Sequence, residues 1–232
     1  MIIDEINRGN VSRVFGELIT LIEASKRKGA EGLEVLLPYS KQPFSVPDNV
    51  YLIGTMNTAD KSLATLDLAL RRRFHFTEMP PEPELLDEVT VGNVNIGRLL
   101  RTINQRIEVL LDRDHCIGHA NFMRLRADRS FPVLQDIFQR QVLPLLQEYF
   151  FEDWQRIAWV LNDHRKPNEA HRFLKRPKVD VAALFGTDAD VPQRNLRWEI
   201  NAAAFELAAS YLGVIDATLA VPGETASVDV AS

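Results

Sequence analysis

The sequence has little cysteine, no excess of positive charge and no long apolar run. Cys116 is the only cysteine among 232 residues, so no internal disulfide can form, and we expect a reducing compartment such as the cytoplasm. The formal net charge of -5 argues against a globally basic surface for nucleic acid. No apolar stretch reaches the roughly 20 residues that span a bilayer, so we expect no membrane association. With 46% apolar and 25% charged residues, the composition is that of a globular protein.

Three zones of the chain differ in their residue patterns. Residues 1–79 mix short apolar runs with helical spacing, which predicts an α/β domain. The stretch "PPEPE" at 80–84 marks a linker. Residues 85–163 repeat apolar side chains at helical spacing and predict an all-helical domain. Residues 164–232 predict a basic connection, a last helix and a disordered tail.

The same patterns predict individual elements. In the first zone we expect a strand that ends at 1–3, a helix over 11–25, a hairpin within 33–47, a buried strand at 49–57, a helix over 63–74 and a short strand at 74–79. Beyond it we expect helices over 99–110, 134–149, 153–163 and 197–215, a solvated and mobile basic stretch at 164–178, and disorder from Pro222. Pro144 should kink or end the helix over 134–149.

Two adjacent carboxylates, Asp4 and Glu5, follow the apolar run at 1–3. At a strand end, one carboxylate can hold Mg²⁺ and the next can polarise an attacking water, as nucleotide hydrolysis requires. Ligands of open α/β sheets also bind at the carboxyl ends of strands. A surface turn produces the same two residues, so the pair alone leaves both interpretations open.

A second polar group, "GTMNTAD" at 54–60, follows the next apolar run. Asn57 can donate a hydrogen bond to a phosphate or to a water without adding charge, and Asp60 can hold a loop or an arginine. A turn closed by an Asn side chain explains the same residues.

Three arginines in a row, at 71–73, precede Phe74. Crowded guanidinium groups are costly unless an anion is near, and an arginine aimed at the γ-phosphate accelerates phosphoryl transfer. The alternative is a solvated basic helix end, which the helix dipole favours.

Together these features resemble the AAA+ nucleotide hydrolases, because an acidic strand end, a polar strand end and an arginine cluster follow one another within the first 75 residues. One branch is closer. The stretches "IIDEINRGNVSRVFGELITLIE", "VPDNVYLIGTMNTADKSLATLDLALRRRF", "IGHANF" and "PLLQEYFFEDW" are similar to the McrB family, GTP-dependent subunits of modification-dependent (5-methylcytosine) restriction systems. The resemblance extends from residue 1 to about residue 163.

The resemblance implies a role for each site residue. It makes Asp4 the Walker B aspartate that holds Mg²⁺ and Glu5 the catalytic glutamate. It makes Asn57 the sensor asparagine and Asp60 the aspartate of the "NTAD" motif. Arg72 and Arg73 would be arginine fingers that act on the nucleotide of the adjacent subunit. Residues 1–79 would be the C-terminal part of an AAA+ α/β core, with a sheet that runs from the Walker B strand onward, and 85–163 its helical lid.

The resemblance also implies cofactors and partners. It implies Mg²⁺ and GTP, with ATP as the less favoured substrate, and self-assembly into a ring, hexameric in the family. It further implies a partner endonuclease subunit, with DNA reached only through that partner or through a domain outside this sequence.

A phosphate-binding P-loop (Walker A), G-x-x-x-x-G-K-[ST], does not occur in this sequence. The nearest glycines, in "RKGAEG" at 27–32, have no following Lys-Ser/Thr. In an AAA+ sheet the strand before the P-loop would lie between the strands at 50–56 and 74–77, so we expect both to expose apolar side chains and unpaired backbone groups. We therefore expect the C-terminal part of a longer protein, from a misplaced start or a truncated gene, inactive by itself.

Two other functions fit the same residues. The sequence keeps arginines that act in trans and lacks the cradle that acts in cis, so it could supply arginine fingers to a ring as a non-catalytic subunit. A MoxR-like or dynein-related chaperone ATPase is the other alternative, against which the "NTAD" and "QEYFFEDW" wording argues.

Overall fold

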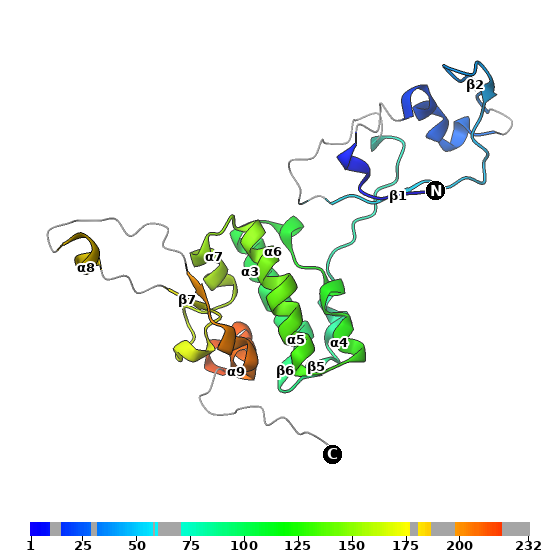
Figure 1. The fold of residues 1–232 in the computed structure, drawn as a ribbon. Coiled ribbons are helices and arrows are strands. Elements are labelled where there is room, and N and C mark those ends of the chain that lie inside the picture. Colours follow the sequence, from blue (N-terminus) through cyan, green and yellow to red (C-terminus); the bar gives the residue numbers. More distant parts are fainter. Residues whose placement is uncertain are drawn as a thin grey trace. The chain divides into compact units, whose positions relative to one another are not determined.

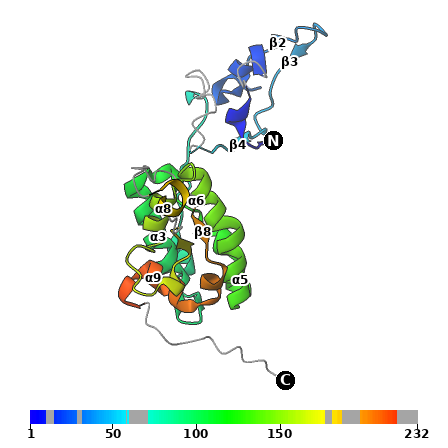
Figure 2. The same ribbon diagram turned by 60° about the vertical axis from the view of Figure 1, so that its left-hand side comes forward.

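The computed structural model describes residues 1–9, 15–28, 32–57, 59, 71–176, 181–186 and 198–219. The chain divides into two compact units, Met1–Met79 and Pro80–Ser232. Each has an apolar core of its own. Figures 1 and 2 draw the described helices and strands of both units as ribbons. None of the described helices is long and apolar enough to cross a membrane.

The first unit is built on a pair of short parallel strands. Strand β1 (Ile2–Ile3) pairs with β4 (Ile53–Gly54), with Ile2 opposite Ile53. Both side chains are exposed, at 73% and 57%. The buried strand predicted at 49–57 forms only at Ile53–Gly54 and is not buried there, whereas the exposure expected of the strand at 50–56 is found at Ile53.

A hairpin and several 3₁₀ segments complete the described part of this unit. Strand β2 (Val35–Leu36) pairs antiparallel with β3 (Pro43–Phe44), within the hairpin predicted at 33–47. The 3₁₀ segments are Ile6–Arg8, Gly16–Ile22 and Ala24–Lys26. The small core centres on Ile6 and Ile22.

Two predictions for the first unit are wrong in detail. The helix over 11–25 does not form as one α-helix in its described part, because Gly16 has a φ of +50° and Glu23 is extended, which interrupts a right-handed α-helix. Residues 74–79 form no strand, because no described strand lies beside them to share backbone hydrogen bonds. The helix predicted over 63–74 lies outside the described residues except for its last four positions.

The second unit is helical and is organised around α3 (Ile96–Leu110), as the apolar spacing predicts. Asn95 caps this helix by accepting a hydrogen bond from the Arg98 amide at 2.7 Å. Leu100 and Ile103, on its apolar face, are fully buried. The remaining α-helices described are α4 (Arg124–Ala127), α5 (Phe131–Ile137), α6 (Leu143–Tyr149), α7 (Trp154–Val160), α8 (Val181–Phe185) and α9 (Ala208–Ile215).

Short strands and 3₁₀ segments connect these helices. The strands form two antiparallel pairs, β5 (Thr90–Val91) with β6 (Val94–Asn95) and β7 (Leu174–Lys175) with β8 (Glu199–Ile200). The 3₁₀ segments are Pro83–Leu86, Arg113–His115, His119–Phe122, Glu169–His171, Ala202–Glu206 and Ala217–Leu219.

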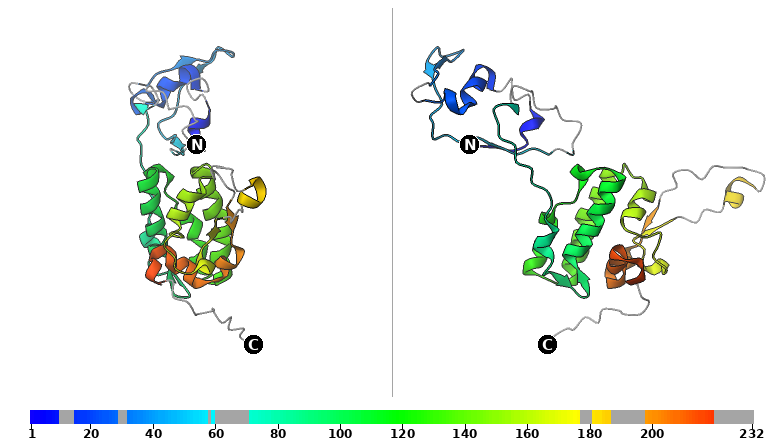
Figure 3. Two further views of the ribbon diagram at one scale, coloured as in Figure 1. Left: turned by 90° about the vertical axis from the view of Figure 1, so that its left-hand side faces the viewer. Right: turned by 180° about the vertical axis from the view of Figure 1, so that it is seen from behind.

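Helices α5 and α6 run on as one helix, which Figure 3 shows from two sides. A π-helical segment, Phe138–Val142, joins them directly before Pro144. Proline cannot donate the backbone bond that an α-helix needs and clashes with the preceding turn. The wider π turn accommodates it, so Pro144 does not end the helix.

The stretch expected to be a solvated connection, 164–178, is instead packed into the second unit as far as it is described. Lys166, His171 and Leu174 are buried, and Phe173 lies in an aromatic cluster with Phe138, Phe205 and Tyr211. The stretch is buried because Phe173 and Leu174 supply apolar side chains within the basic run. The charge of Lys166 is balanced by the buried carboxylate of Asp163.

The helix predicted over 197–215 starts late, at Ala208. Glu199 and Ile200 pair with β7 instead, and the Asn201 side chain donates to the carbonyl oxygens of Ala170 and Arg172 at 3.1 and 2.9 Å. Strand pairing therefore overrides the local helical pattern. The tail predicted to be disordered from Pro222 lies outside the described residues.

Candidate active site at the ends of the parallel strands

The pairing of β1 with β4 brings the polar residues that follow both strands to one edge. The Thr55 backbone N–H donates to the Ile3 carbonyl at 3.0 Å and extends the ladder beyond the strands. Asp4 and Glu5 therefore lie beside the segment 55–57. The carboxyl ends of parallel strands are where open α/β sheets bind ligands.

The two carboxylates have different neighbours. The Thr55 hydroxyl donates a hydrogen bond to Oδ1 of Asp4, and the Glu5 carboxylate pairs with the Arg8 guanidinium. Both acidic residues are exposed. An exposed ion pair is worth about 1 kcal/mol or less, so the Glu5 carboxylate can exchange Arg8 for a water or a ligand.

Glu5 has a strained backbone. Its φ of 49° and ψ of 50° are left-handed, and it precedes the 3₁₀ turn Ile6–Arg8 without capping it. A non-glycine residue in this region costs on the order of 1–3 kcal/mol, and such strain is common where a side chain must be aimed. Here the Glu5 amide donates to the Thr55 hydroxyl at 3.1 Å, which supports the strained turn.

Asn57 lies at the same edge and closes a turn. Its side-chain oxygen accepts a hydrogen bond from the Ala59 amide at 3.0 Å, as the turn interpretation predicts. Its backbone carbonyl accepts from Nδ2 of Asn7 at 3.2 Å. Asn7 is 92% buried, and its Oδ1 has no hydrogen-bond partner among the described residues.

Sequence reasoning did not select Asn7 or Thr55. The available signal was their position: both are polar residues that flank a strand end within three residues of a predicted catalytic side chain. Their contacts to Asp4, Glu5 and Asn57 could not be read from that position alone.

The arginines at 71–73 differ in their surroundings. Arg73 is half-buried and forms an ion pair with Glu23, with 2.9 Å between Nε and Oε1. Arg72 is exposed. The structure therefore joins Arg73 to Glu23 rather than to Asp4 or Glu5, and Asp60 lies outside the described residues.

The donor atoms at this edge suit Mg²⁺. Proteins bind this ion through one or two carboxylates plus phosphates of the substrate and several waters. Asp4 provides one exposed carboxylate, with Oδ1 oriented by Thr55. Within the described ranges, no three His, Cys, Asp or Glu side chains cluster as metal ligands.

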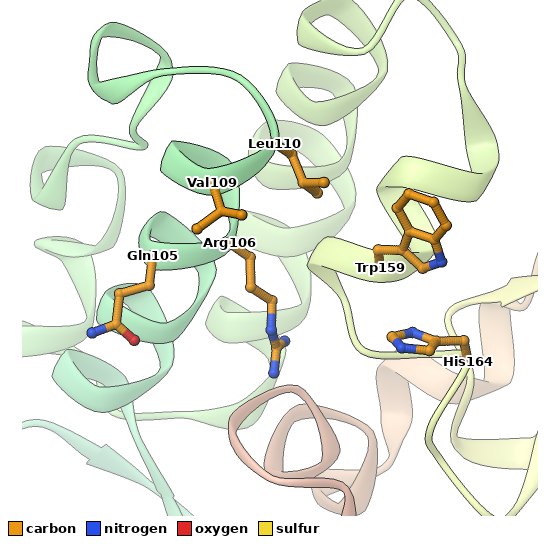
Figure 4. A pocket seen from close by; sticks show the side chains of 6 residues that line it. All are labelled: Gln105, Arg106, Val109, Leu110, Trp159 and His164. Atoms are coloured by element: carbon orange, nitrogen blue, oxygen red, sulfur yellow. The ribbon is translucent and has the colours of Figure 1, made fainter.

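A hollow of about 450 Å³ lies in the second unit (Figure 4). Its lining is mainly apolar and consists of Gln105, Arg106, Val109, Leu110, Trp159 and His164. The Arg106 guanidinium donates to the Val160 carbonyl at 2.8 Å, and burial lowers the pKa of Arg106. Arg106 thus joins α3 to α7, and the hollow contains none of the predicted site residues.

Both units match known protein families. Residues 1–74 match the AAA domain of the dynein-related subfamily, and residues 95–158 match the α-helical lid domain of McrB. The chain is also 41% identical over 170 residues to the type IV methyl-directed restriction enzyme EcoKMcrB subunit of Escherichia coli K12, which covers 66% of this chain and 37% of that protein.

This chain belongs to the McrB family of AAA+ proteins. A second relative is the type II restriction enzyme BsuMI component YdiS of Bacillus subtilis 168, 30% identical over 86 residues, which cover 33% of this chain and 25% of that protein. The chain therefore spans well under half of either relative.

The two family matches fall in different units of the structure, the AAA match in the first unit and the lid match in the second. The AAA match contains Asp4, Glu5, Asn57, Arg72 and Arg73, and the lid match runs from the Asn95 cap of α3 into α7. The fold class predicted from sequence, an α/β AAA+ sheet followed by an all-helical lid, is confirmed. Residues 198–219 lie beyond the lid match but share the core of that unit.

Proposed function

We propose that residues 1–232 provide the hydrolytic groups and the lid of a nucleotide-hydrolysing AAA+ motor in a restriction system. The main support is the position of Asp4 and Glu5 at the end of β1, beside the strand that leads to Asn57, within the AAA match. GTP is the proposed substrate and ATP the less favoured one. This choice rests on the family resemblance, because no described residue is assigned to reading a base.

The proposed reaction is attack of water on the γ-phosphorus, with cleavage of its bond to the β–γ bridging oxygen. Glu5 polarises the attacking water through its carboxylate, and the Asn57 amide orients the water or a γ-phosphate oxygen. Asp4 holds Mg²⁺, which neutralises charge on the phosphates when bound. Arg72 and Arg73 stabilise developing charge on nucleotide held by an adjacent subunit, and Asp60 supports the site loop.

The proposed assembly is a ring, hexameric by resemblance, that drives a partner endonuclease on modified DNA. The supporting observation is that the Escherichia coli relative is named as a subunit of a methyl-directed restriction enzyme. DNA contact is assigned to the partner or to a domain outside these residues, in keeping with the net charge of -5. The P-loop is likewise assigned to residues outside this sequence.

The test is phosphate release by a P-loop-joined chain, in which the P-loop-bearing segment of a homologue directly precedes residue 1. We expect Mg²⁺-dependent release from GTP that exceeds release from ATP. Tight GTP binding without any phosphate release, in the presence of Mg²⁺ and at ring-forming concentration, would contradict the proposal.

A second candidate function is a ring subunit that hydrolyses nothing itself and supplies arginines in trans. The exposed position of Arg72 favours it. The unmodified chain is mixed with a P-loop-containing homologue, and the turnover of the homologue is measured. Stimulation that disappears with Arg72→Ala but survives Arg126→Ala, an exposed lid arginine, supports this role; an unchanged rate with the wild-type chain excludes it.

A dynein-related chaperone ATPase is the third candidate. The AAA match at 1–74 is to the dynein-related subfamily, but the lid match is to McrB and both relatives are named as restriction-enzyme components. The restriction function is therefore the better supported of the two.

A further inference from the structure

Thr55 contacts four consecutive residues at the end of β1. Its N–H donates to the Ile3 carbonyl at 3.0 Å, and its carbonyl accepts from the Ile6 amide at 2.8 Å. Its hydroxyl donates to Oδ1 of Asp4 and accepts from the Glu5 amide at 3.1 Å. One residue of the second strand thus holds the whole turn that carries both carboxylates.

The chemistry of the hydroxyl group fixes the direction of both bonds. An ionised carboxylate only accepts hydrogen bonds, and a backbone amide only donates them. The single hydroxyl proton therefore points at Asp4, and a lone pair of the same oxygen faces Glu5. Serine can make both bonds, whereas valine has the same branched shape as threonine and can make neither.

We propose that Thr55 is a positioning residue for the two carboxylates, and this role in turnover rests on the proposed hydrolytic function. The hydroxyl holds Asp4 in one rotamer and holds the Glu5 amide in its left-handed turn. The backbone contacts of Thr55 align the strands whatever the side chain is. The hydroxyl therefore positions Asp4 and Glu5 and is not needed for the pairing of the strands.

Amide hydrogen exchange of the unmodified 232-residue chain tests the contact directly, by NMR. In Thr55→Val the Glu5 amide should exchange about three- to tenfold faster, because one hydrogen bond is lost. The Ile6 amide and the amide of residue 55 should stay unchanged, because their partners are backbone carbonyls. Thr55→Ser should resemble the wild type.

Two exchange results would overturn the assignment. An unchanged rate at Glu5 in Thr55→Val would mean that the hydroxyl does not hold this amide. An equal increase at Glu5, Ile6 and residue 55 would mean that the substitution merely frays the strands.

Turnover of the P-loop-joined chain tests the consequence. Thr55→Val should lower kcat about 10- to 100-fold, the usual effect of losing a group that orients a ligand-binding side chain. The Mg²⁺ concentration for half-maximal rate should rise, the KM for nucleotide should change little, and Thr55→Ser should restore the rate. A wild-type kcat in Thr55→Val, or an equal loss in Thr55→Ser, overturns the proposal.

Glu5→Gln in the same chain separates the two levels of inference. If Glu5→Gln abolishes turnover and Thr55→Val does not lower it, only the positioning role fails. If Glu5→Gln also leaves turnover intact, the hydrolytic role of this edge fails, and the exchange experiment alone then decides whether Thr55 holds the turn.

Discussion

Replacing Lys166 by methionine should strongly destabilise the second unit. The Lys166 and Asp163 side chains are 0% and 2% exposed, with 2.7 Å between Nζ and Oδ1. Nζ also lies 4.2 Å from the centre of the Phe173 ring, and Oδ2 of Asp163 accepts from the Leu174 amide at 2.8 Å. Methionine retains most of the aliphatic stem but leaves the Asp163 carboxylate buried without its cation.

The size of the effect follows from burial. Removing one partner of a buried ion pair costs about 3–5 kcal/mol, whereas replacing both partners is often neutral. Asparagine at 163 can still accept from the Leu174 amide, so Lys166→Met combined with Asp163→Asn should recover much of the loss. The exposed pair Arg156–Asp153, with the same i,i+3 spacing, is the matched control. Arg156→Met should cost about 1 kcal/mol or less.

The assay is denaturant unfolding followed by tryptophan fluorescence. All three tryptophans, Trp154, Trp159 and Trp198, lie in the second unit, so the signal reports that unit alone. Equal losses for Lys166→Met and Arg156→Met would refute the reasoning. So would a double variant as unstable as the sum of its single variants, because coupled residues should not be additive.

The same pair predicts a pH dependence. Burial lowers the pKa of Lys166 from 10.5 to about 8, despite the attraction of Asp163. Between these values Lys166 keeps its proton in the unfolded chain and loses it in the folded chain, so this residue alone makes the free energy of unfolding rise with pH. The gain is at most about 3 kcal/mol. It should appear as the difference between the pH profiles of the wild type and Lys166→Met, because burial raises the pKa of Cys116, Tyr149 and Tyr211 in both proteins.

Two further substitutions test the packing of the second unit with the same fluorescence assay. Gly97→Ala should cost about 1–3 kcal/mol, because its Cβ would overlap the Asp87 carboxylate and lie 2.8 Å from the Pro83 carbonyl oxygen; Gly118→Ala, whose nearest atom is at 4.0 Å, is the control and should change little. Asn104→Ala should cost about 2–4 kcal/mol, because it removes both side-chain bonds, 2.9 and 2.8 Å, to the buried backbone of Ile117. A loss below about 1 kcal/mol would contradict the assigned burial.

The helical unit could be predicted well wherever one apolar face repeats over several turns. The spacing of Leu99, Leu100, Ile103 and Ile107 placed α3, because a face that long has few alternative partners. The stretch around Lys166 could not be predicted, because lysine is ordinarily a surface residue. Its burial depends on Asp163 and on the pairing of β7 with β8, a contact between distant parts of the chain.

The candidate site was predictable in its residue types and not in its hydrogen bonds. Asp4 and Glu5 could be placed beside Asn57 because parallel strands end at one edge. The Thr55 hydroxyl contact to Asp4 joins residues 51 positions apart, and no local pattern encodes it. The ion pair of Arg73 with Glu23 could not be predicted either, because the two residues are distant in the sequence and no local pattern joins them.

The most direct test of the central claim is single-turnover GTP hydrolysis by the P-loop-joined chain with Glu5→Gln. The control is Glu34→Gln, which changes an exposed glutamate outside the site. We predict that Glu5→Gln lowers the rate by about 100-fold or more while GTP affinity is retained, since a base that polarises the water acts in the transition state. Glu34→Gln should match the wild type. A rate for Glu5→Gln within about threefold of the control would contradict the assignment of this edge as the hydrolytic site.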